Sequence, residues 1–410
     1  MENYFSIADI AEHLKVSIKS VRRLIAAKAI ESVKIGNVYR IPEKALKVYL
    51  KRNSNKKKEE KEISFDLPSD QKEVEFVDIS KDWDNVKNTN MTFVDLFCGA
   101  GGLSKGLEMA GLHGICGLDW FEEAGMTYRR NFKHPFVNGD ITLPEKKQEF
   151  YDTVKKSLGK RKLTIVAGGF PCQGFSMAGN RIVEDPRNSL YKEMLEIVKT
   201  LQPEYVICEN VKGLRSMLGG QIEKKIIADY KKIGYEMTVE TLCAANYYTP
   251  QKRERVIFIG NRIGKKNLHP KPILEPKDYI TTGTAIADLM NHPEDPAFNH
   301  VPTEHRPDMV EKMKKLPEGQ SLYKGYSDAW KKCPWNEASC TIKENHGGVN
   351  IHPKLPRVLT AREMARLQSF PDDFIFEGKK NKQLVQIGNA VPPLLGKAIG
   401  LAIKKSKEAK

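Results

Sequence analysis

The stretch Gly168-Gly169-Phe170-Pro171-Cys172-Gln173-Gly174-Phe175-Ser176 directly follows the short apolar run Leu163-Thr164-Ile165-Val166-Ala167. A run of this length, bounded by glycine, predicts a buried strand of a parallel sheet. Open α/β sheets place ligands and chemistry just beyond the carboxyl ends of such strands, and Cys172 stands at that point. Because Pro171 fixes φ immediately before it, the thiol is presented from a stiffened backbone. A free cysteine is more often a small buried hydrophobe, so a chemical role for Cys172 depends on its surroundings.

Length and composition narrow the class of protein. The 410 residues are too many for one compact core, so two or three domains are expected. The 67 Lys and Arg exceed the 52 Asp and Glu, and the net charge of +15 indicates a polyanion binder, although a merely basic protein would share it. Seven cysteines without a C-x-x-C pair argue against disulfides and a zinc site, so we expect no metal and a reducing compartment. Because neither a bilayer-spanning segment nor a signal peptide is evident, we expect a cytoplasmic protein without membrane contact.

Residues 1–52 are expected to form a separate small domain. Ser6 with Asp9 is a helix-capping pattern, and a second helix is expected from Ser17 after a short turn. Residues 32–41 predict a β-hairpin with a two-residue turn, and Pro42 favours the start of a third helix.

The charge of this first domain favours contact with DNA. The second helix carries Lys19, Arg22 and Arg23 away from its apolar side, and the first 61 residues hold 15 Lys and Arg against 7 Asp and Glu. The alternative is a helical protein-interaction domain with a solvated basic face. Residues 53–90 begin with a mixed charge run, 56–62, that is too polar to pack, so we expect a flexible linker.

From Met91 the pattern changes to that of a cofactor-binding α/β unit. Residues 92–97 predict a strand, which leads into Cys98-Gly99-Ala100-Gly101-Gly102 and a helix that ends at Gly111. Strand, glycine turn and helix form the nucleotide-binding half of a Rossmann-like unit, although the spacing is not the G-x-G-x-x-G of dinucleotide sites. The glycines allow close approach of a ligand to the backbone.

Acidic and aromatic residues follow the next two expected strands. Asp119 can accept hydrogen bonds from ribose hydroxyls, and Trp120 offers a face on which adenine can stack. Asp140 suits an adenine amino group. Each could stand in an ordinary surface turn, but three successive strand ends of this kind indicate a nucleoside cofactor.

Further along, a second reactive group and a cationic strand appear. Glu209 ends the predicted buried strand 204–208, where it is either a catalytic acid or a helix cap. Strand alternation places Gln251, Arg253 and Arg255 on one face, which suits a phosphate or a base edge, or else a solvated edge strand.

Taken in order, these segments resemble the DNA (cytosine-5) methyltransferases, and the first 50 residues resemble excisionase and MerR-like winged helix-turn-helix modules. The motifs that carry the first resemblance are Asp95-Leu96-Phe97-Cys98-Gly99-Ala100-Gly101-Gly102, Pro171-Cys172-Gln173, Glu209-Asn210-Val211, Gln251-Lys252-Arg253-Glu254-Arg255, the helix start within 357–368, and Gly388-Asn389-Ala390-Val391-Pro392. Asp119 stands where the family more often has Glu, and Cys98 replaces a usually less reactive residue.

The resemblance implies a Rossmann-like methyltransferase domain over residues 91–262 and 356–410, with a loop-rich target-recognition lobe over 263–355. It implies S-adenosylmethionine as cofactor, with S-adenosylhomocysteine as product. The residues expected to line its site are Phe97, Gly99, Ala100, Gly101, Gly102, Asp119, Trp120, Asp140, Ile141, Pro171, Leu190, Asn389 and Ala390.

The same resemblance assigns catalytic and DNA-contacting residues. Cys172 would be the nucleophile, Glu209 the proton donor to the base, and Arg255 with Arg253 would hold the oxygen of the base. The target cytosine would be flipped out of double-stranded DNA, and the polar segment 174–188 is expected to be a mobile loop that closes over it. The residues expected near DNA are Lys19, Arg22, Arg23, Gln173, Ser176, Arg187 and Gln251.

The biological setting implied is a restriction–modification or related bacterial defence system, with a monomeric enzyme and a cognate endonuclease encoded nearby. Two alternatives stay open from the sequence. One is a transfer-RNA cytosine-5 methyltransferase, and the other is a DNA-binding regulator with an inactive methylase core.

Overall fold

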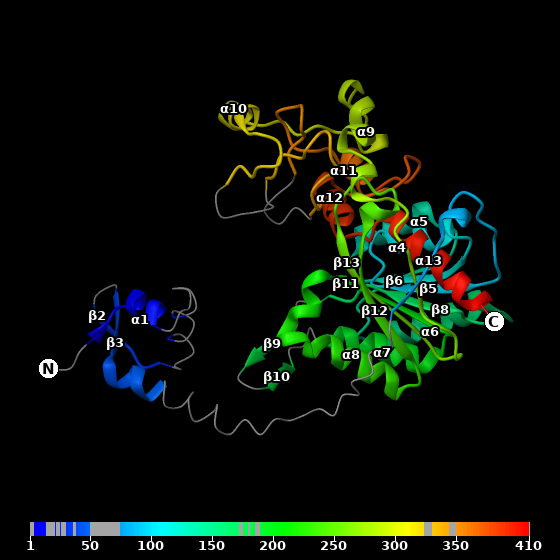
Figure 1. The fold of residues 1–410 in the computed structure, drawn as a ribbon, viewed down its shortest axis with the longest axis horizontal. Coiled ribbons are helices and arrows are strands. Elements are labelled where there is room, and N and C mark those ends of the chain that lie inside the picture. Colours follow the sequence, from blue (N-terminus) through cyan, green and yellow to red (C-terminus); the bar gives the residue numbers. More distant parts are fainter. Residues whose placement is uncertain are drawn as a thin grey trace. The chain divides into compact units, whose positions relative to one another are not determined.

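The computed structural model describes residues 4–13, 21, 25, 30–35, 38–49, 74–171, 175–178, 181–184, 189–323, 330–343 and 350–409. The chain divides into two compact units, Met1–Ser69 and Asp70–Lys410. Their internal folds are shown in Figure 1.

In the described part of the N-terminal unit, the helix α1 (Ile7–His13) packs on a three-stranded sheet. The elements described are β1 (Tyr4–Phe5), α1 (Ile7–His13), β2 (Val33–Ile35), β3 (Val38–Pro42) and a helix over 43–49, with sheet order β1-β3-β2. Ser6 and Asp9 cap α1 reciprocally, since each backbone N–H donates to the other side chain, at 2.8 and 3.2 Å. The predicted cap, hairpin and third helix are therefore confirmed. Lys19, Arg22 and Arg23 lie outside the described residues.

The second unit is built on a seven-stranded sheet in the order β12-β13-β11-β8-β5-β6-β7. The strands are β5 (Thr92–Leu96), β6 (His113–Asp119), β7 (Phe136–Asn138), β8 (Ile165–Gly168), β11 (Tyr205–Val211), β12 (Glu236–Cys243) and β13 (Glu254–Asn261). Only β13 among these strands runs antiparallel to its neighbours. The predicted α/β class and the predicted buried strand before Cys172 are confirmed.

Helices cover both faces of this sheet (Figure 1). The elements are α4 (Gly102–Met109), α5 (Glu122–Asn131), α6 (Pro144–Leu158), α7 (Ser189–Leu201), η3 (Lys212–Gly220), α8 (Gln221–Lys232), η4 (Ala244–Tyr247) and α13 (Pro393–Glu408). One apolar cluster joins α6, α7 and α8 to the sheet, and another joins α4 and α13 to its opposite face. A Cβ on Gly106 would lie 2.2 Å from the Pro393 carbonyl, so the glycine permits the close packing of α4 on α13.

Residues 74–90 are packed on the catalytic unit, which corrects the predicted linker over 53–90. In this segment β4 (Glu75–Val77) pairs in parallel with β14 (Leu268–Pro270), followed by η1 (Ser80–Asp82). Ile79 is fully buried and Trp83 nearly so. The charge run at 56–62 lies outside the described residues, and the two apolar side chains further on attach the chain to the core.

A short β-hairpin occupies part of the segment that the sequence predicts to be a polar loop. β9 (Phe175–Ala178) and β10 (Arg181–Glu184) pair antiparallel. The missed signal is the dipeptide Gly179-Asn180, which in a sequence is typical of a two-residue hairpin turn.

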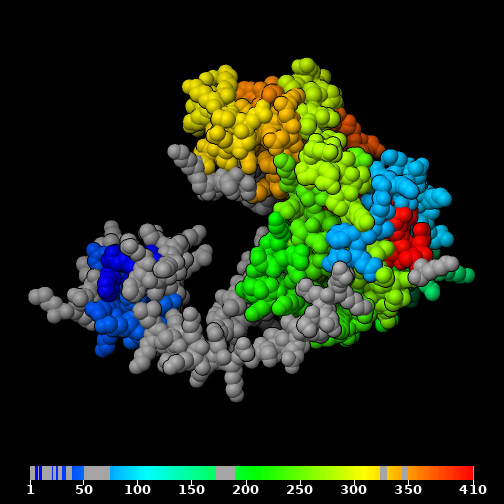
Figure 2. Space-filling view, in the orientation of Figure 1, coloured from blue at the N-terminus to red at the C-terminus, as the bar shows by residue number. Residues whose placement is uncertain are grey.

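The described part of residues 271–355 consists of short helices and irregular chain, much of it coloured yellow to orange in Figure 2. Its helices and those beside it are η5 (Pro276–Asp278), α9 (Thr282–Ile286), η6 (Ala287–Asn291), η7 (Pro296–Phe298), α10 (Pro307–Lys315), α11 (Ala361–Leu367) and α12 (Lys380–Asn389). The predicted capping box of Thr360 and Glu363 begins α11. No helix in the described part of the chain is long and apolar enough to cross a bilayer.

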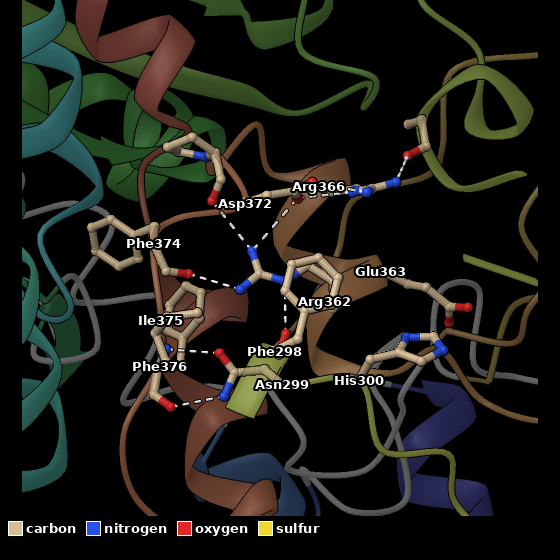
Figure 3. Close-up of polar contacts among 12 residues, drawn as sticks. Phe298, Asn299, His300, Arg362, Glu363, Arg366, Asp372, Phe374, Ile375 and Phe376 are labelled. Carbon is tan, nitrogen blue, oxygen red and sulfur yellow. Dashed lines mark hydrogen bonds and ion pairs between the residues drawn. The ribbon is translucent and has the colours of Figure 1, made fainter. Parts of the chain in front are cut away.

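A buried arginine of α11 joins η7 to the segment that follows α11 (Figure 3). The Arg362 guanidinium has no exposed surface and donates to the carbonyls of Phe298, Pro371 and Phe374 at 2.9, 3.2 and 2.9 Å. Next to it, Asn299 exchanges two hydrogen bonds with the backbone of Phe376, at 2.8 and 2.9 Å. These contacts hold η7 and Asn299 against the segment that follows α11.

Candidate active site

Three strand ends meet at one edge of the sheet. Leu96, Gly168 and Cys208 lie side by side in register on β5, β8 and β11. The residue after each therefore lies at the same edge, and Glu209 and Gly169 are two of these residues. Since β8 and β5 are neighbours whose connections leave in opposite directions, this edge is a topological switch point, where α/β sheets bind ligands.

The predicted nucleophile lies outside the described residues. Cys172, Gln173 and Arg187 are not described, and Ser176 belongs to β9 without a described side chain. The description reaches Pro171, which is exposed at the end of the β8 segment. The roles predicted for these four residues therefore stay predictions.

Glu209 and Arg255 form an ion pair at this edge. Arg255 Nε lies 2.9 Å from Glu209 Oε1, and each side chain is 13% exposed. Burial raises the pKa of Glu209, although the guanidinium groups of Arg255 and Arg253 act to lower it. A carboxyl group with a raised pKa can carry a proton and donate it.

The backbone before Cys172 is attached to the same strand as Glu209. A Cβ on Gly169 would stand 2.8 Å from Glu209 Oε2, so only glycine leaves the carboxylate room. Asn210 Nδ2 donates to the Phe170 carbonyl at 2.8 Å, while its Oδ1 accepts from the Val211 N–H at 2.9 Å. The sequence analysis missed this positioning role of Asn210, for which the only signal was its place beside Glu209.

Arg253 is a structural link rather than a surface cation. Its side chain is 2% exposed and donates to the carbonyls of Ile342 and Gly388, at 2.7 and 2.8 Å. The predicted catalytic contact of Arg253 is therefore revised: both terminal nitrogens of the guanidinium hold backbone carbonyls, so it positions Arg255 and the chain around it.

Gln251 is equally enclosed, which corrects its predicted contact with DNA. It has no exposed surface, its Nε2 donates to the Leu367 carbonyl at 3.1 Å, and its Oε1 accepts from the Ile342 N–H at 2.8 Å. The expected alternation holds, because Lys252 and Glu254 are exposed. The buried face of this segment, however, binds protein backbone.

The glycine turn after β5 has the open geometry expected of a ligand loop. Phe97, Gly99 and Gly101 have positive φ angles of 56°, 53° and 93°. Asp119 at the end of β6 holds the turn, since its Oδ2 accepts from the Gly99 N–H at 2.8 Å and its Oδ1 accepts from the Phe121 N–H at 2.9 Å. A non-glycine residue at positive φ stores strain of a kind that clusters at ligand sites.

The C-terminal motif reaches the same turn. A Cβ on Gly102 would meet the Val391 carbonyl at 2.2 Å and Ala390 Cβ at 3.2 Å. Asn389 is exposed and Ala390 is half-buried next to it. The predicted cofactor residues in the turn after β5 and those at 389–390 are therefore neighbours, although they lie far apart in the sequence.

The remaining predicted cofactor residues surround these strand ends. Trp120 is 73% exposed after β6, which leaves a ring face free for stacking. Asp140 is exposed and accepts from the Thr142 N–H at 2.9 Å. Ala100 and Ile141 are buried and Leu190 is half-buried. Among the described residues neither Asp119 nor Asp140 forms an ion pair, so both carboxylates suit the hydroxyl and amino groups of a nucleoside.

Comparison with protein families identifies two segments of the chain. Residues 91–405 match the family described as C-5 cytosine-specific DNA methylase, and residues 4–54 match a helix-turn-helix domain.

Two relatives show how far the similarity extends. The Type II methyltransferase M1.HphI of Haemophilus parahaemolyticus is 36% identical over 331 residues, which span 77% of this chain and 87% of the relative. The Type II methyltransferase M.Eco47II of Escherichia coli is 28% identical over 428 residues, which span 98% and 96%.

Solved structures agree with this assignment. A putative DNA modification methyltransferase encoded within a prophage of E. coli is 25% identical with a TM-score of 0.61, over 78% of this chain and 99% of that one. The Entamoeba histolytica methyltransferase EhMeth is 16% identical with a TM-score of 0.55, over 78% and 99%, and shows the shared fold.

Proposed function

This chain belongs to the C-5 cytosine-specific DNA methylase family and is a DNA (cytosine-5-)-methyltransferase with an N-terminal helix-turn-helix domain, and from that premise we propose how its own residues perform the reaction. The proposed substrate is a flipped-out cytosine in a short specific site of double-stranded DNA. The observation that carries the mechanism is the buried pair of Glu209 and Arg255, which contacts Gly169 three residues before Cys172.

Cys172 is the proposed nucleophile. Carbon 5 of cytosine is a poor nucleophile, and a thiolate bond to carbon 6 turns the ring into an electron-rich enamine. A cysteine thiolate is intrinsically potent even when it is a minor species at neutral pH. Asn210 supports the presentation of this thiol, because it holds the Phe170 carbonyl at 2.8 Å.

Glu209 supplies the proton that makes this attack favourable. Its raised pKa lets it donate to N3 of the ring, which withdraws electrons from carbon 6. Arg255, 2.9 Å from Glu209, orients the carboxyl group and is proposed to hold the oxygen at C2 of the base. Arg253 is proposed to act indirectly, because it donates hydrogen bonds to the carbonyls of Ile342 and Gly388 and so holds the surrounding chain in place.

The residues at the strand ends fit S-adenosylmethionine. When bound, this cofactor supplies an electrophilic methyl group. Trp120 would stack on its adenine, Asp119 and Asp140 would bind its hydroxyl and amino groups, and the turn from Phe97 to Gly102 would admit its chain close to the backbone. The exposed indole of Trp120 supports this assignment. So do the carboxylates of Asp119 and Asp140, which form no ion pair among the described residues.

Contacts with DNA are proposed at three places. The base is hidden in the duplex and must be rotated out of the stack, and Gln173, Ser176 and Arg187 are proposed near it. The lobe within residues 263–355 would read the target sequence. Lys19, Arg22 and Arg23 of the helix-turn-helix domain would add phosphate contacts.

The setting is proposed to be a bacterial restriction–modification system. The support is that M1.HphI and M.Eco47II are Type II methyltransferases. A cytoplasmic, monomeric enzyme with a cognate endonuclease encoded nearby fits this setting.

A direct test is methyl transfer from labelled donor to matched DNA and transfer-RNA substrates. We expect transfer to duplex DNA by the native chain and by Cys243→Ala, but not by Cys172→Ala. Transfer to RNA alone would overturn the DNA assignment. Full activity of Cys172→Ala would overturn the nucleophile, and inactivity of the native chain on every DNA would favour a regulator with an inert core.

A further inference from the structure

Asp95 is a buried acid to which the proposed reaction gives no role. It lies on β5 just before the glycine turn, is 1% exposed, and its Oδ2 lies 2.7 Å from Ser104 Oγ. In the described part of the chain no lysine or arginine pairs with it. A carboxylate buried without a cation is unfavourable, so the neutral acid is the form that burial selects.

A chain of hydroxyl groups leads from Asp95 towards the surface. Ser104 Oγ lies 2.9 Å from the Tyr128 hydroxyl, which lies 2.7 Å from His134 Nε2. His134 Nδ1 is 3.4 Å from Glu108 Oε1, and the two side chains are 7% and 34% exposed. Because each hydroxyl both donates and accepts, this chain can reverse its direction and carry one proton.

The groups that face Asp95 are mostly acids or neutral at physiological pH. They are Asp119 from β6, Glu209 from β11, Cys98 from the turn, Ser104 from α4 and Tyr128 from α5. Burial raises the pKa of Cys98 and of Tyr128, so both stay uncharged. Burial, with the charges of Asp119 and Glu209, raises the pKa of Asp95 to about 7. Asp95 therefore changes charge in the physiological range.

We propose that Asp95 gives up a proton when the cationic sulfonium cofactor binds, and keeps it when the uncharged thioether product binds. The inference rests on the proposed function, because it takes S-adenosylmethionine as the ligand at these strand ends. An opposite charge close to a carboxyl group favours its ionised form. The sulfonium centre and the thioether differ by that one charge, so only the donor should favour ionisation of Asp95.

The proton balance is simple. The O–H bond of Asp95 breaks as Ser104 Oγ accepts the proton, the Ser104 proton passes to the Tyr128 oxygen, and the Tyr128 proton passes to His134 Nε2. His134 then releases its Nδ1 proton to Glu108 or to water. Each molecule in which Asp95 ionises on binding releases one proton, so the average release at pH 7 is less than one proton per cofactor bound. Ser104 and Tyr128 end as they began apart from the direction of their hydrogen bonds, and His134 ends as its other tautomer.

This linkage lets the enzyme prefer donor over product in a pH-dependent way. As the pH rises through the pKa of Asp95, the ionised form becomes available without loss of a proton, and the donor binds more tightly. A drop of about one pKa unit on binding changes the donor-to-product affinity ratio by about fivefold between pH 6 and pH 8, and by about tenfold over the whole titration. Product affinity should change little.

Titration calorimetry tests the proposal on the full chain. S-adenosylmethionine and S-adenosylhomocysteine are each titrated at pH 7 in phosphate and in Tris, whose ionisation enthalpies differ. We expect proton release with the donor only, and no such difference in Asp95→Asn. Asp152→Asn, which removes an exposed acid on α6, should keep the native difference. Melting curves show that each variant is folded, and the comparison in the native chain needs no variant.

Each outcome is decisive. Equal proton release with the two ligands, or a native difference retained by Asp95→Asn, would overturn the role of Asp95. If neither ligand binds the native chain, the proposed function itself fails.

Discussion

Glu209 and Gly169 come from neighbouring strands and leave no space between them, since a methyl group on Gly169 would lie 2.8 Å from Glu209 Oε2. The carboxyl group that is proposed to protonate the base therefore packs directly on the backbone that leads to Cys172. This arrangement couples the acid to the nucleophile through three residues of chain. A side chain at position 169 should therefore displace the carboxyl group of Glu209 while the fold stays intact.

Replacing Gly169 with alanine should reduce kcat by about a hundredfold, the effect typical of displacing a catalytic group by about 1 Å. Cofactor affinity should stay native, because the glycine turn after β5 is untouched. The check is single-turnover methyl transfer together with calorimetric cofactor binding. Gly213→Ala is the matched control, since a Cβ there meets nothing within 4 Å. Native kcat for Gly169→Ala would contradict the close packing.

Replacing Asn210 with aspartate should slow attack by Cys172 without unfolding the protein. Aspartate keeps an oxygen for the Val211 N–H but loses the donor that holds the Phe170 carbonyl at 2.8 Å. We expect about a tenfold lower kcat, unchanged KM for the cofactor, and a loss of about 1 kcal/mol in stability. Pre-steady-state rates and urea unfolding measure these quantities. If KM for the cofactor also rose about tenfold, the substitution would have disturbed the site as a whole rather than the attack by Cys172.

The pH dependence of kcat should report the proton on Glu209. Burial raises the pKa of this group, so the neutral acid persists to higher pH than in water and is lost as the pH rises through that pKa. Activity should therefore fall on the alkaline side of this titration, and Glu209→Gln should lack that limb while retaining a low, flat rate. An unchanged profile in the variant would assign the limb to another group.

Loss of Arg357 should strongly destabilise the part of the fold around α11. Glu363 has no exposed surface and receives two hydrogen bonds from Arg357, at 2.7 and 2.8 Å. Although burial acts to raise it, these hydrogen bonds hold the pKa of Glu363 below its usual value. Arg357→Met should cost about 3–5 kcal/mol, because it leaves a buried carboxylate unpaired. The urea midpoint measures this cost.

The double variant Arg357→Met with Glu363→Met should recover much of that loss, since no charge stays buried.

The ion pair of Arg357 and Glu363 should also make the stability of the native protein sensitive to acid. Because the folded pKa of Glu363 is lowered, its contribution to stability is present above the unfolded pKa and is lost as the pH falls through the folded one. Equal stability of the single and double variants would show that the pair contributes little.

Local patterns predicted those parts of the fold that depend on neighbouring residues. The caps of Ser6 with Asp9 and of Thr360 with Glu363 form as expected, because both partners lie within one helical turn. Short apolar runs bounded by glycine predicted β5, β8 and β11. The glycine turn, Asp119 and Trp120 meet at one edge because parallel strands end together.

Contacts over long sequence distances escaped prediction. Alternation put Gln251 and Arg253 on one face, but whether that face met solvent depended on Ile342 and Gly388, which are 89 and 135 residues from Arg253. Trp83 likewise became an anchor only because Tyr248 and Lys397 pack against it. The function of a buried polar side chain is set by such distant partners.

The most direct test of the account uses duplex DNA in which 5-fluorocytosine replaces the target cytosine, incubated with the full chain and S-adenosylmethionine. Because fluorine cannot leave as a proton does, the account predicts a stable protein–DNA adduct, and peptide mapping should place the bond at Cys172. Cys172→Ala should form no adduct, whereas Cys243→Ala should form it normally. A native enzyme that methylates ordinary sites yet gives no adduct, or an adduct at another residue, would contradict the central claim.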